Sequence, residues 1–182
     1  MPPKNLSNHI VICNWSEKCI SIVRELRAKA LKLKKPIVII SDGINEKSFP
    51  ELDELEEFRN VYLVKGDPAY ELNLKRANIT DGFSCIILSQ QNAGSYADAQ
   101  SVLIAMTVKQ LCEEKGCRKV HIVAEAVDPK NFEHLKKAGC DEIVSAGDFA
   151  LRIIEGKAYV NDEVVAEGEF TAMVVEKGKP LK

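Results

Sequence analysis

The sequence predicts an α/β fold built on a Rossmann-like, doubly wound parallel sheet of six strands, followed by a short C-terminal β-like appendage. Short, fully apolar segments recur along the chain, and such strands are typical of parallel sheets covered by helices on both faces. Segments with helical patterning separate them, as the crossovers between parallel strands require. The 182 residues, of which 46% are hydrophobic, are enough for one domain with its own core.

The first predicted strand is His9–Cys13, and an amphipathic helix is predicted over residues 20–29. The turn between them lies where dinucleotide-binding proteins carry the G-x-G-x-x-G fingerprint. When the segment is aligned on the helix, the three glycine positions hold Asn14, Ser16 and Cys19. The junction of a nucleotide-binding fold is therefore kept, while the close approach of backbone to a pyrophosphate is altered.

The remaining elements alternate in the same way. Each strand is predicted from an apolar run that ends in a polar or glycine-containing turn, and each helix from apolar residues at helical spacing. The predicted strands are Pro36–Ile40, Val61–Val64, Ser84–Leu88, Lys119–Glu125 and Glu142–Ser145, and the predicted helices are Pro50–Phe58, Glu71–Ala77, a long helix after Gly94, and Lys130–Ala138.

Core-facing residues are predicted for two of these helices. Leu72 and Leu74 are expected to anchor the helix over 71–77. Ser95 and Asp98 resemble a capping box at the start of the long helix. The inward stripe of the long helix is predicted to comprise Ala99, Val102, Leu103, Met106 and Leu111.

A domain boundary is predicted near Gly147, which separates a nucleotide-binding domain at 1–147 from an appendage at 148–182. The appendage is expected to contain a short helix over 148–155 and short strands over 159–160, 164–166 and 170–175. It is too short for an independent core, so it is expected to pack on its own sheet or on a neighbouring subunit.

Composition argues against several classes of function. The net charge is −2 and the basic residues are scattered among acids, so no nucleic-acid partner is expected. No signal peptide is recognised, and no apolar run reaches the roughly 20 residues of a membrane span. The six cysteines form no C-x-x-C pair and are expected to be reduced thiols. The three histidines are scattered and no catalytic set is recognised, so neither a metal site nor a catalytic residue is predicted.

Four segments resemble the N-terminal lobe of the RCK (regulator of potassium conductance) or TrkA-N domain family: His9–Glu17, Lys65–Pro68, Leu74–Ile79 and Ala138–Val144. The resemblance covers roughly residues 8–146. It implies a cytoplasmic regulatory module that assembles as a homo-oligomer, a dimer or a ring, beneath a potassium channel pore or a transporter membrane subunit. The implied ligands are NAD, NADH, ATP or ADP and, in some members, calcium or other cations.

Ligands of open α/β sheets bind at the carboxyl ends of the strands, near the point where strand order reverses. The N-terminus of the first helix favours phosphate there, and Trp15 and Lys18 could line or cover it. Asp42 lies 23 positions after Cys19, near the offset of an acid that contacts ribose hydroxyls; the alternative is a capped turn with Asp42 in solvent. The predicted cofactor-binding residues are Asn14, Trp15, Ser16, Glu17, Asp42, Gly66, Asp67, Ser89 and Glu125.

A calcium site is not expected. The resemblance implies calcium ligands after the fourth strand and, one residue apart, after the fifth, where this chain has Ser89, Glu125 and Val127. Calcium requires six or more oxygens with several carboxylates, which this set does not supply. Glu125 at a strand end could instead hold a nucleotide ribose or a lysine from a neighbour.

The predicted function is therefore a non-enzymatic, cytoplasmic domain that gates a potassium channel or transporter in response to an adenine nucleotide or ion, with membrane association through that channel or transporter subunit. Two alternatives stay open. One is a small NAD-dependent oxidoreductase, for which the chain offers no clear catalytic set. The other is a degenerate oligomerisation scaffold that binds no nucleotide.

Overall fold

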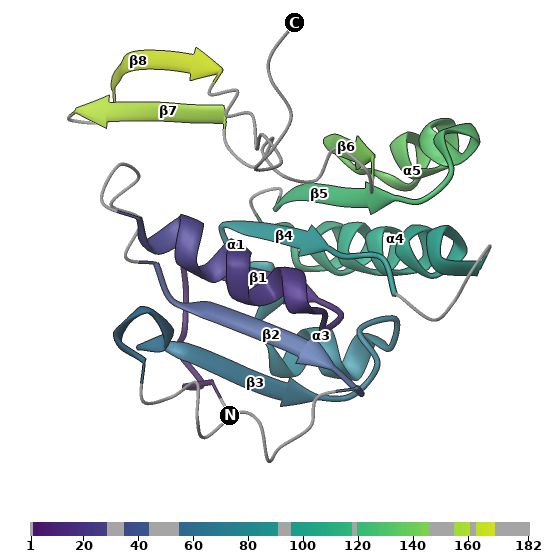
Figure 1. The fold of residues 1–182 in the computed structure, drawn as a ribbon, viewed down its shortest axis with the longest axis horizontal. Helices are drawn as coiled ribbons and strands as arrows, with labels where there is room; N and C mark the ends of the chain where they lie inside the picture. The colour runs from purple at the N-terminus through teal and green to yellow at the C-terminus, as the bar shows by residue number, and fades with distance from the viewer. Residues whose placement is uncertain are drawn as a thin grey trace, which may run out of the picture.

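The computed structural model describes residues 2–28, 35–43, 55–90, 96–117, 120–145, 155–160 and 163–169; for residue 17 and the last two segments it describes the backbone alone. A six-stranded parallel sheet with the order β3-β2-β1-β4-β5-β6 dominates the fold, which confirms the predicted fold class (Figure 1). The strands of this sheet are β1 (Ile10–Cys13), β2 (Ile37–Ser41), β3 (Val61–Lys65), β4 (Ser84–Ile87), β5 (His121–Ala126) and β6 (Glu142–Ser145).

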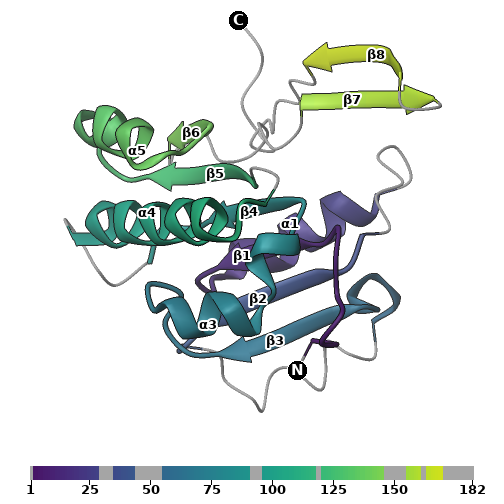
Figure 2. The same ribbon diagram turned by 180° about the vertical axis from the view of Figure 1, so that it is seen from behind.

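Helices cover both faces of the sheet, which explains why its central strands are buried along their whole length. On one face α1 (Glu17–Arg27) and the 3-10 turn η1 (Glu56–Phe58) pack against alternate residues of β1 and β2. On the other face lie α3 (Glu71–Arg76), α4 (Ala97–Lys115) and α5 (Phe132–Ala138), as Figure 2 shows from behind. Two further 3-10 turns, η2 (Ile79–Asp81) and η4 (Pro129–Asn131), lead into β4 and α5.

Strand order reverses between β1 and β4, because β1 pairs with β2 on one side and with β4 on the other. All of these pairs are parallel, so every strand of the sheet ends at the same edge. We call this edge, made of the residues that directly follow the strands, the crest. A crest at such a reversal is the usual place for a ligand in an open α/β sheet.

Two predictions about the shorter helices were wrong in part. The helix α1 begins at Glu17 rather than at residue 20, because Ser16 is extended (φ −150°, ψ 169°) and serves as the N-cap. In α3 Leu74 is buried as predicted, but Leu72 is 68% exposed. A helix of little more than one turn presents only one face to the sheet, so it buries one of the two leucines.

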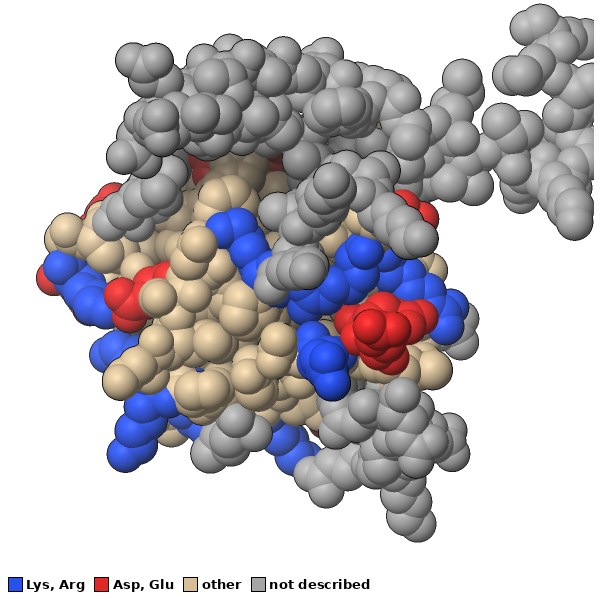
Figure 3. All heavy atoms as spheres, turned by 90° about the vertical axis from the view of Figure 1, so that its left-hand side faces the viewer, with Lys and Arg blue, Asp and Glu red and all other residues tan. Residues whose placement is uncertain are grey.

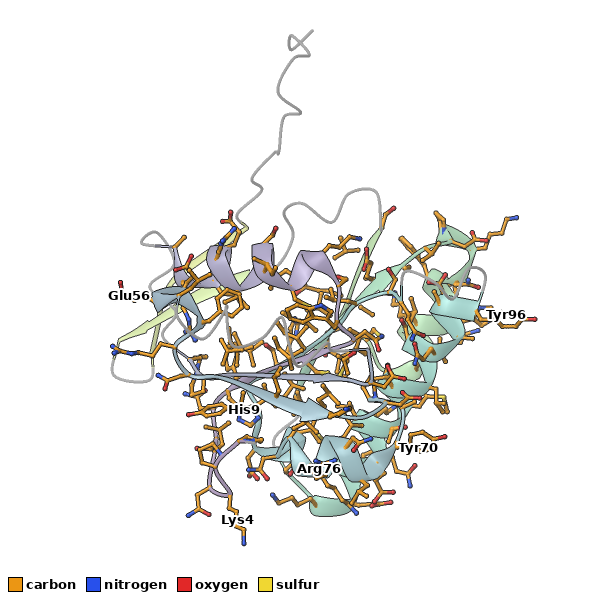
Figure 4. All side chains as sticks on the ribbon, turned by 60° about the horizontal axis from the view of Figure 1, so that its bottom comes forward. Lys4, His9, Glu56, Tyr70, Arg76 and Tyr96 are labelled. Atoms are coloured by element: carbon orange, nitrogen blue, oxygen red, sulfur yellow. The ribbon has the colours of Figure 1, made fainter. Side chains whose placement is uncertain are left out.

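The predicted orientation of the long helix was also wrong. Although Leu111 is buried and Val102 partly buried, Leu103 and Met106 are 52% and 55% exposed, and Ala99 is exposed as well. Tyr96, which precedes the helix, is 77% exposed and points away from the body of the molecule (Figure 4). The buried face comprises Ala97, Asp98, Ser101, Ile104, Ala105, Val108, Leu111 and Cys112. We call Tyr96, Ala99, Leu103 and Met106 the exposed stripe of α4.

Several predictions fall outside the described residues. They include most of the helix predicted over 50–58, Ser95 of the proposed capping box, most of the helix predicted over 148–155, and the strand predicted over 170–175. In the appendage β7 (Glu155–Val160) and β8 (Glu163–Glu169) form an antiparallel pair, which includes the strands predicted over 159–160 and 164–166. Glu155 therefore begins a strand. The domain boundary near Gly147 stays a prediction.

Charges of both signs are interspersed on the face seen in Figure 3, where blue and red side chains lie among tan ones. Arg24 and Glu57 form an ion pair across α1 and η1 at 3.4 Å. Within the described segments, no helix has both the length and the apolar character that crossing a membrane requires.

Candidate functional site

The turn that follows β1 is held by Asn14. Its φ of 72° lies in the left-handed region, which asparagine adopts more readily than most residues other than glycine. The Asn14 backbone N–H donates to the Ile40 carbonyl at 2.9 Å, and its side-chain Nδ2 donates to the Leu88 carbonyl at 2.8 Å. Asn14 thus joins the ends of β2, β1 and β4 at the strand-order reversal. Glycine could not do this, because it has no side chain to bond the Leu88 carbonyl.

Ser16 and Cys19 complete this turn. The Ser16 backbone N–H donates to Cys19 Sγ at 3.5 Å, and that thiol lies 3.5 Å from the Asn14 carbonyl, to which it donates. Burial raises the pKa of Cys19 to about 11, so the thiol stays protonated and acts as a donor. Ser16 Oγ is buried with no hydrogen-bond partner among the described atoms. The third glycine position of the fingerprint is therefore filled by a side chain that stabilises the turn.

The other two predicted residues of this turn have different surroundings. Trp15 is half-buried and packs against the core between α1 and the sheet. Glu17 is the first residue of α1, and its side chain lies outside what the structure describes.

A polar network joins α1 to the part of the crest formed by the ends of β4 and β5. Glu125, at the end of β5, is only 1% exposed. Its Oε2 accepts hydrogen bonds from Ser89 N at 2.9 Å and from Ser89 Oγ at 2.8 Å, and its Oε1 forms an ion pair with Lys18 Nζ. The structure therefore brings together two predicted site residues and adds Lys18, whose partner the sequence did not indicate.

The remaining predicted residues form a second group beyond β2. Asp42 is exposed directly after β2, and the Gly66 backbone N–H donates to the Ser41 carbonyl at 3.0 Å. Gly66 has a φ of 145°, and a Cβ at this position would lie 2.4 Å from Asn73 Nδ2, so the turn requires glycine. The Lys65-Gly66-Asp67 turn is thereby held against β2 and α3.

Asp67 accepts from the Ala69 N–H at 2.8 Å and from Gln100 Nε2 at 3.3 Å. Its carboxylate therefore shapes its own turn and contacts α4.

The first turns of α4 contact both groups. While Gln100 reaches Asp67, the neighbouring Asp98 accepts from the backbone N–H of Val127 at 2.7 Å and of Asp128 at 2.9 Å. Asp98 also accepts from Asn131 Nδ2 at 2.7 Å, so it holds the loop after β5. Local sequence carries no signal for this role, because its partners lie about 30 residues away. The expected pairing of Asp98 with Ser95 in a capping box lies outside the described residues and stays a prediction.

The donor set of the crest is suited to a polar organic ligand. It offers a helix N-terminus at the strand-order reversal, an exposed carboxylate at Asp42 and a lysine ammonium at Lys18. Across the described residues, no group of three or more His, Cys, Asp and Glu side chains is arranged to hold a metal ion.

Comparison with known protein families finds one whose profile matches residues 5–141, described as the calcium-activated potassium channel slowpoke-like RCK domain. The calcium-gated potassium channel TvoK of Thermoplasma volcanium is 35% identical over 155 residues, which cover 83% of this chain and 40% of that protein. Potassium channel protein 1 of Methanocaldococcus jannaschii is 30% identical over 141 residues, covering 78% of this chain and 37% of that protein. The chain thus spans about two fifths of the length of these relatives.

Solved structures share the fold at lower identity. The GsuK channel bound to NAD superposes with a TM-score of 0.59 at 22% identity, over 79% of this chain and 22% of that chain. GsuK bound to ADP gives the same TM-score and identity, over 79% of this chain and 32% of that chain. The TrkA-N domain of the inner membrane protein ybaL from Escherichia coli gives 0.60 at 17% identity, covering 79% and 90% of the two chains.

Proposed function

The chain belongs to the calcium-activated potassium channel slowpoke-like RCK domain family, and from that premise we propose that it regulates a potassium channel or transporter by binding an adenine nucleotide at its crest. Family membership supports the regulatory role, since the relatives named above are ion channels. The observation that carries the nucleotide proposal is the N-terminus of α1 at the strand-order reversal, next to β2, which exposed Asp42 directly follows.

The two groups of crest residues have different roles in this proposal. On the side of β2 and β3, Asp42 receives the ribose hydroxyls, and the Gly66-Asp67 turn borders the adenine. At the reversal, the first turn of α1 receives the phosphates. GsuK, which shares the fold, has been solved bound to NAD and bound to ADP, and this supports an adenine nucleotide as the ligand.

Within the crest, the Lys18–Glu125–Ser89 network favours one nucleotide over a dinucleotide. A Rossmann fold has two mononucleotide-binding halves, and the second nucleoside of a dinucleotide lies over the half that begins at β4. Here the side chains of Lys18 and Ser89 meet buried Glu125 across that half. Adding NAD would require this network to open, whereas ADP or ATP would not.

In this proposal, α4 carries the effect of ligand binding from the crest to a neighbouring subunit. Its first turns contact Asp67 on one side of the crest and the loop after β5 on the other. The same helix carries the exposed stripe, an apolar surface that a second copy of the chain would cover. Movement of α4 when a ligand binds would thereby reach the neighbouring subunit, and through it a cytoplasmic ring attached to a membrane pore.

Isothermal titration calorimetry with ADP, ATP, NAD and NADH tests the proposal. Saturable heat with an adenine nucleotide, together with a rise in melting temperature, is expected. Absence of both with all four ligands would favour the oligomerisation scaffold instead. Consumption of NADH in the presence of a carbonyl substrate would favour the oxidoreductase, because a regulatory domain binds its ligand without turnover.

A further inference from the structure

The C-terminal end of α4 places two cysteines side by side. The Cys117 backbone N–H donates to the Cys112 carbonyl at 3.1 Å, and the Gly116 N–H donates to the Glu113 carbonyl at 3.1 Å. Gly116 has left-handed geometry (φ 59°, ψ 31°), so the helix ends in a Schellman motif, in which these two cysteine positions characteristically contact each other. Both side chains also line one cavity beside this helix end. A disulfide requires neighbouring backbone segments, and the backbone hydrogen bond between Cys117 and Cys112 brings these two together.

Access distinguishes this pair from the other cysteines. All six cysteines lie in described segments; five are buried, and Cys117 alone is partly exposed. A cavity of about 380 Å³ lies beside it, and its lining includes Cys112, Cys117, Lys109 and Glu113. A small reagent therefore has room to approach both sulfurs from the amino-end side of β5, away from the crest.

We propose that Cys112 and Cys117 form an oxidation-sensitive pair that a hydroperoxide converts to a disulfide. The Cys117 thiolate attacks the peroxide: an S–O bond forms, the O–O bond breaks, and water or an alcohol leaves after protonation. Cys112 Sγ then attacks Cys117 Sγ: the S–S bond forms, the S–O bond breaks, and the leaving hydroxide takes the proton of Cys112 and departs as water. Two electrons pass from the sulfurs to the peroxide oxygens, so the step needs no further reductant.

The order of these steps follows from the surroundings of the two thiols. Burial, with the nearby Cys117 thiol as a smaller cause, raises the pKa of Cys112 to about 11. A thiol that stays protonated is a poor first nucleophile, but it can complete a disulfide with an adjacent sulfenic acid. The partly exposed Cys117 is therefore the sulfur that meets the oxidant.

A second pair in the same chain provides an internal control. Cys13 Sγ and Cys85 Sγ lie 3.8 Å apart on the neighbouring strands β1 and β4, and both are fully buried. Proximity alone would oxidise this pair as readily as the first. Access predicts instead that Cys13 and Cys85 stay reduced while Cys112 and Cys117 react.

Peptide mass spectrometry after limited hydrogen peroxide treatment of the folded chain, with alkylation of the remaining thiols, tests the proposal. Trypsin cuts after Lys115, between the two cysteines, so the disulfide appears as two linked peptides. We expect loss of two of the six thiols per chain and linkage of Cys112 to Cys117. In Cys112→Ser the reaction should stop at a sulfenic acid on Cys117, which dimedone traps, and Cys117→Ser should give neither product.

Circular dichroism before and after treatment shows whether the chain stays folded. Linkage of Cys13 to Cys85 before Cys112 to Cys117 would overturn the proposal. So would full alkylation of Cys112 and Cys117 after a peroxide dose that oxidises an added free-thiol peptide. These results do not depend on nucleotide binding, so the two proposals can fail separately.

Discussion

Lys18 and Glu125 form an ion pair across 107 positions of sequence, and it joins the first turn of α1 to the end of β5. The two partners differ in exposure, since the Lys18 side chain is 35% exposed and that of Glu125 is not exposed at all. Glu125 also accepts two hydrogen bonds from Ser89, so its carboxylate is surrounded by donors. The pair thus links α1 to β5 across the second half of the crest, and the next two predictions depend on it.

Lys18→Met should destabilise the chain by about 1–3 kcal/mol, because it leaves a buried carboxylate without its ammonium partner. Urea denaturation measures this change. Glu125→Gln in the Lys18→Met background should restore part of the loss, since the amide keeps an acceptor for Ser89 without a charge. Lys75→Met, which breaks the exposed Glu71–Lys75 pair, is the control and should leave stability unchanged. Additive effects of the Lys18 and Glu125 substitutions would show that the two side chains are not coupled.

ADP should bind at least tenfold more tightly than NAD, because the dinucleotide has to displace Lys18 or Ser89 from Glu125. Titration calorimetry of both ligands gives the ratio directly. In Lys18→Met the ratio of the ADP affinity to the NAD affinity should be smaller, mostly because NAD binds more tightly. Equal affinities of the wild-type chain for ADP and NAD would contradict the closed second half while leaving nucleotide binding intact.

Asp42→Ala should weaken an adenosine-containing ligand about tenfold or more, because a lost hydrogen bond to a charged group costs roughly 1.5–3 kcal/mol. The exposed position of Asp42 predicts that the folded domain keeps its stability. A matched substitution at another exposed acid, Glu133→Ala on α5, should leave the affinity unchanged. If Asp42→Ala binds as tightly as the wild-type chain, Asp42 is a solvated turn residue.

Leu103→Gln combined with Met106→Gln should weaken self-association at least tenfold. Burial of each such side chain contributes roughly 1.5–3 kcal/mol, and 1.4 kcal/mol corresponds to a factor of ten. Sedimentation velocity over a concentration series measures the association constant. Leu72→Gln, which changes a leucine of similar exposure on α3, is the control. An unchanged association constant in the double variant would exclude the exposed stripe as the contact.

His9 should make the chain less stable in acid. His9 is fully buried (Figure 4), its Nε2 is bonded to the Ala77 carbonyl at 2.8 Å and its Nδ1 has no partner among the described atoms. Burial lowers the pKa of His9, against smaller opposite effects of the Ala77 bond and the Asp81 charge. Below about pH 6.5 the unfolded chain therefore binds a proton that the folded chain resists, and stability falls as the pH drops.

The free energy of unfolding should change with pH by at most about 1.4 kcal/mol per pH unit through His9. Urea midpoints at pH 7.5 and pH 5.5 measure it. His9→Asn should lose stability at both values but show a smaller difference between them, whereas His134→Asn, at an exposed position on α5, should keep the wild-type difference. The same pH difference in His9→Asn and in the wild type would rule out His9 as the cause.

Much of the fold and part of the site followed from local sequence. Apolar runs such as Pro36–Ile40 predicted buried strands, because a parallel sheet covered on both faces leaves no polar side to its central strands. Once the strands were parallel, residues at or just after their carboxyl ends, such as Glu125 and Ser89, had to share one edge. Their direct contact through two hydrogen bonds agrees with that expectation. Their role in ligand binding stays a prediction.

The orientation of α4 could not be predicted in the same way. Leu103 and Met106 are as apolar as Ile104 and Val108, so periodicity supports either face of the helix as the buried one. The fold resolves this by packing Ile104 and Val108 against the sheet, while Asp98 on the same side holds the loop after β5. Because the two faces of α4 are equally apolar, the packing of the rest of the chain decides which face is buried.

The sequence by itself determined the alternation of strands and helices, the crest positions and the family, because each depends on residues close together in the chain. The tertiary structure alone decided the Lys18–Glu125 pair, the outward face of α4 and the access of Cys117. These depend on the rotation and packing of whole helices against the sheet, which bring together side chains that no local pattern relates.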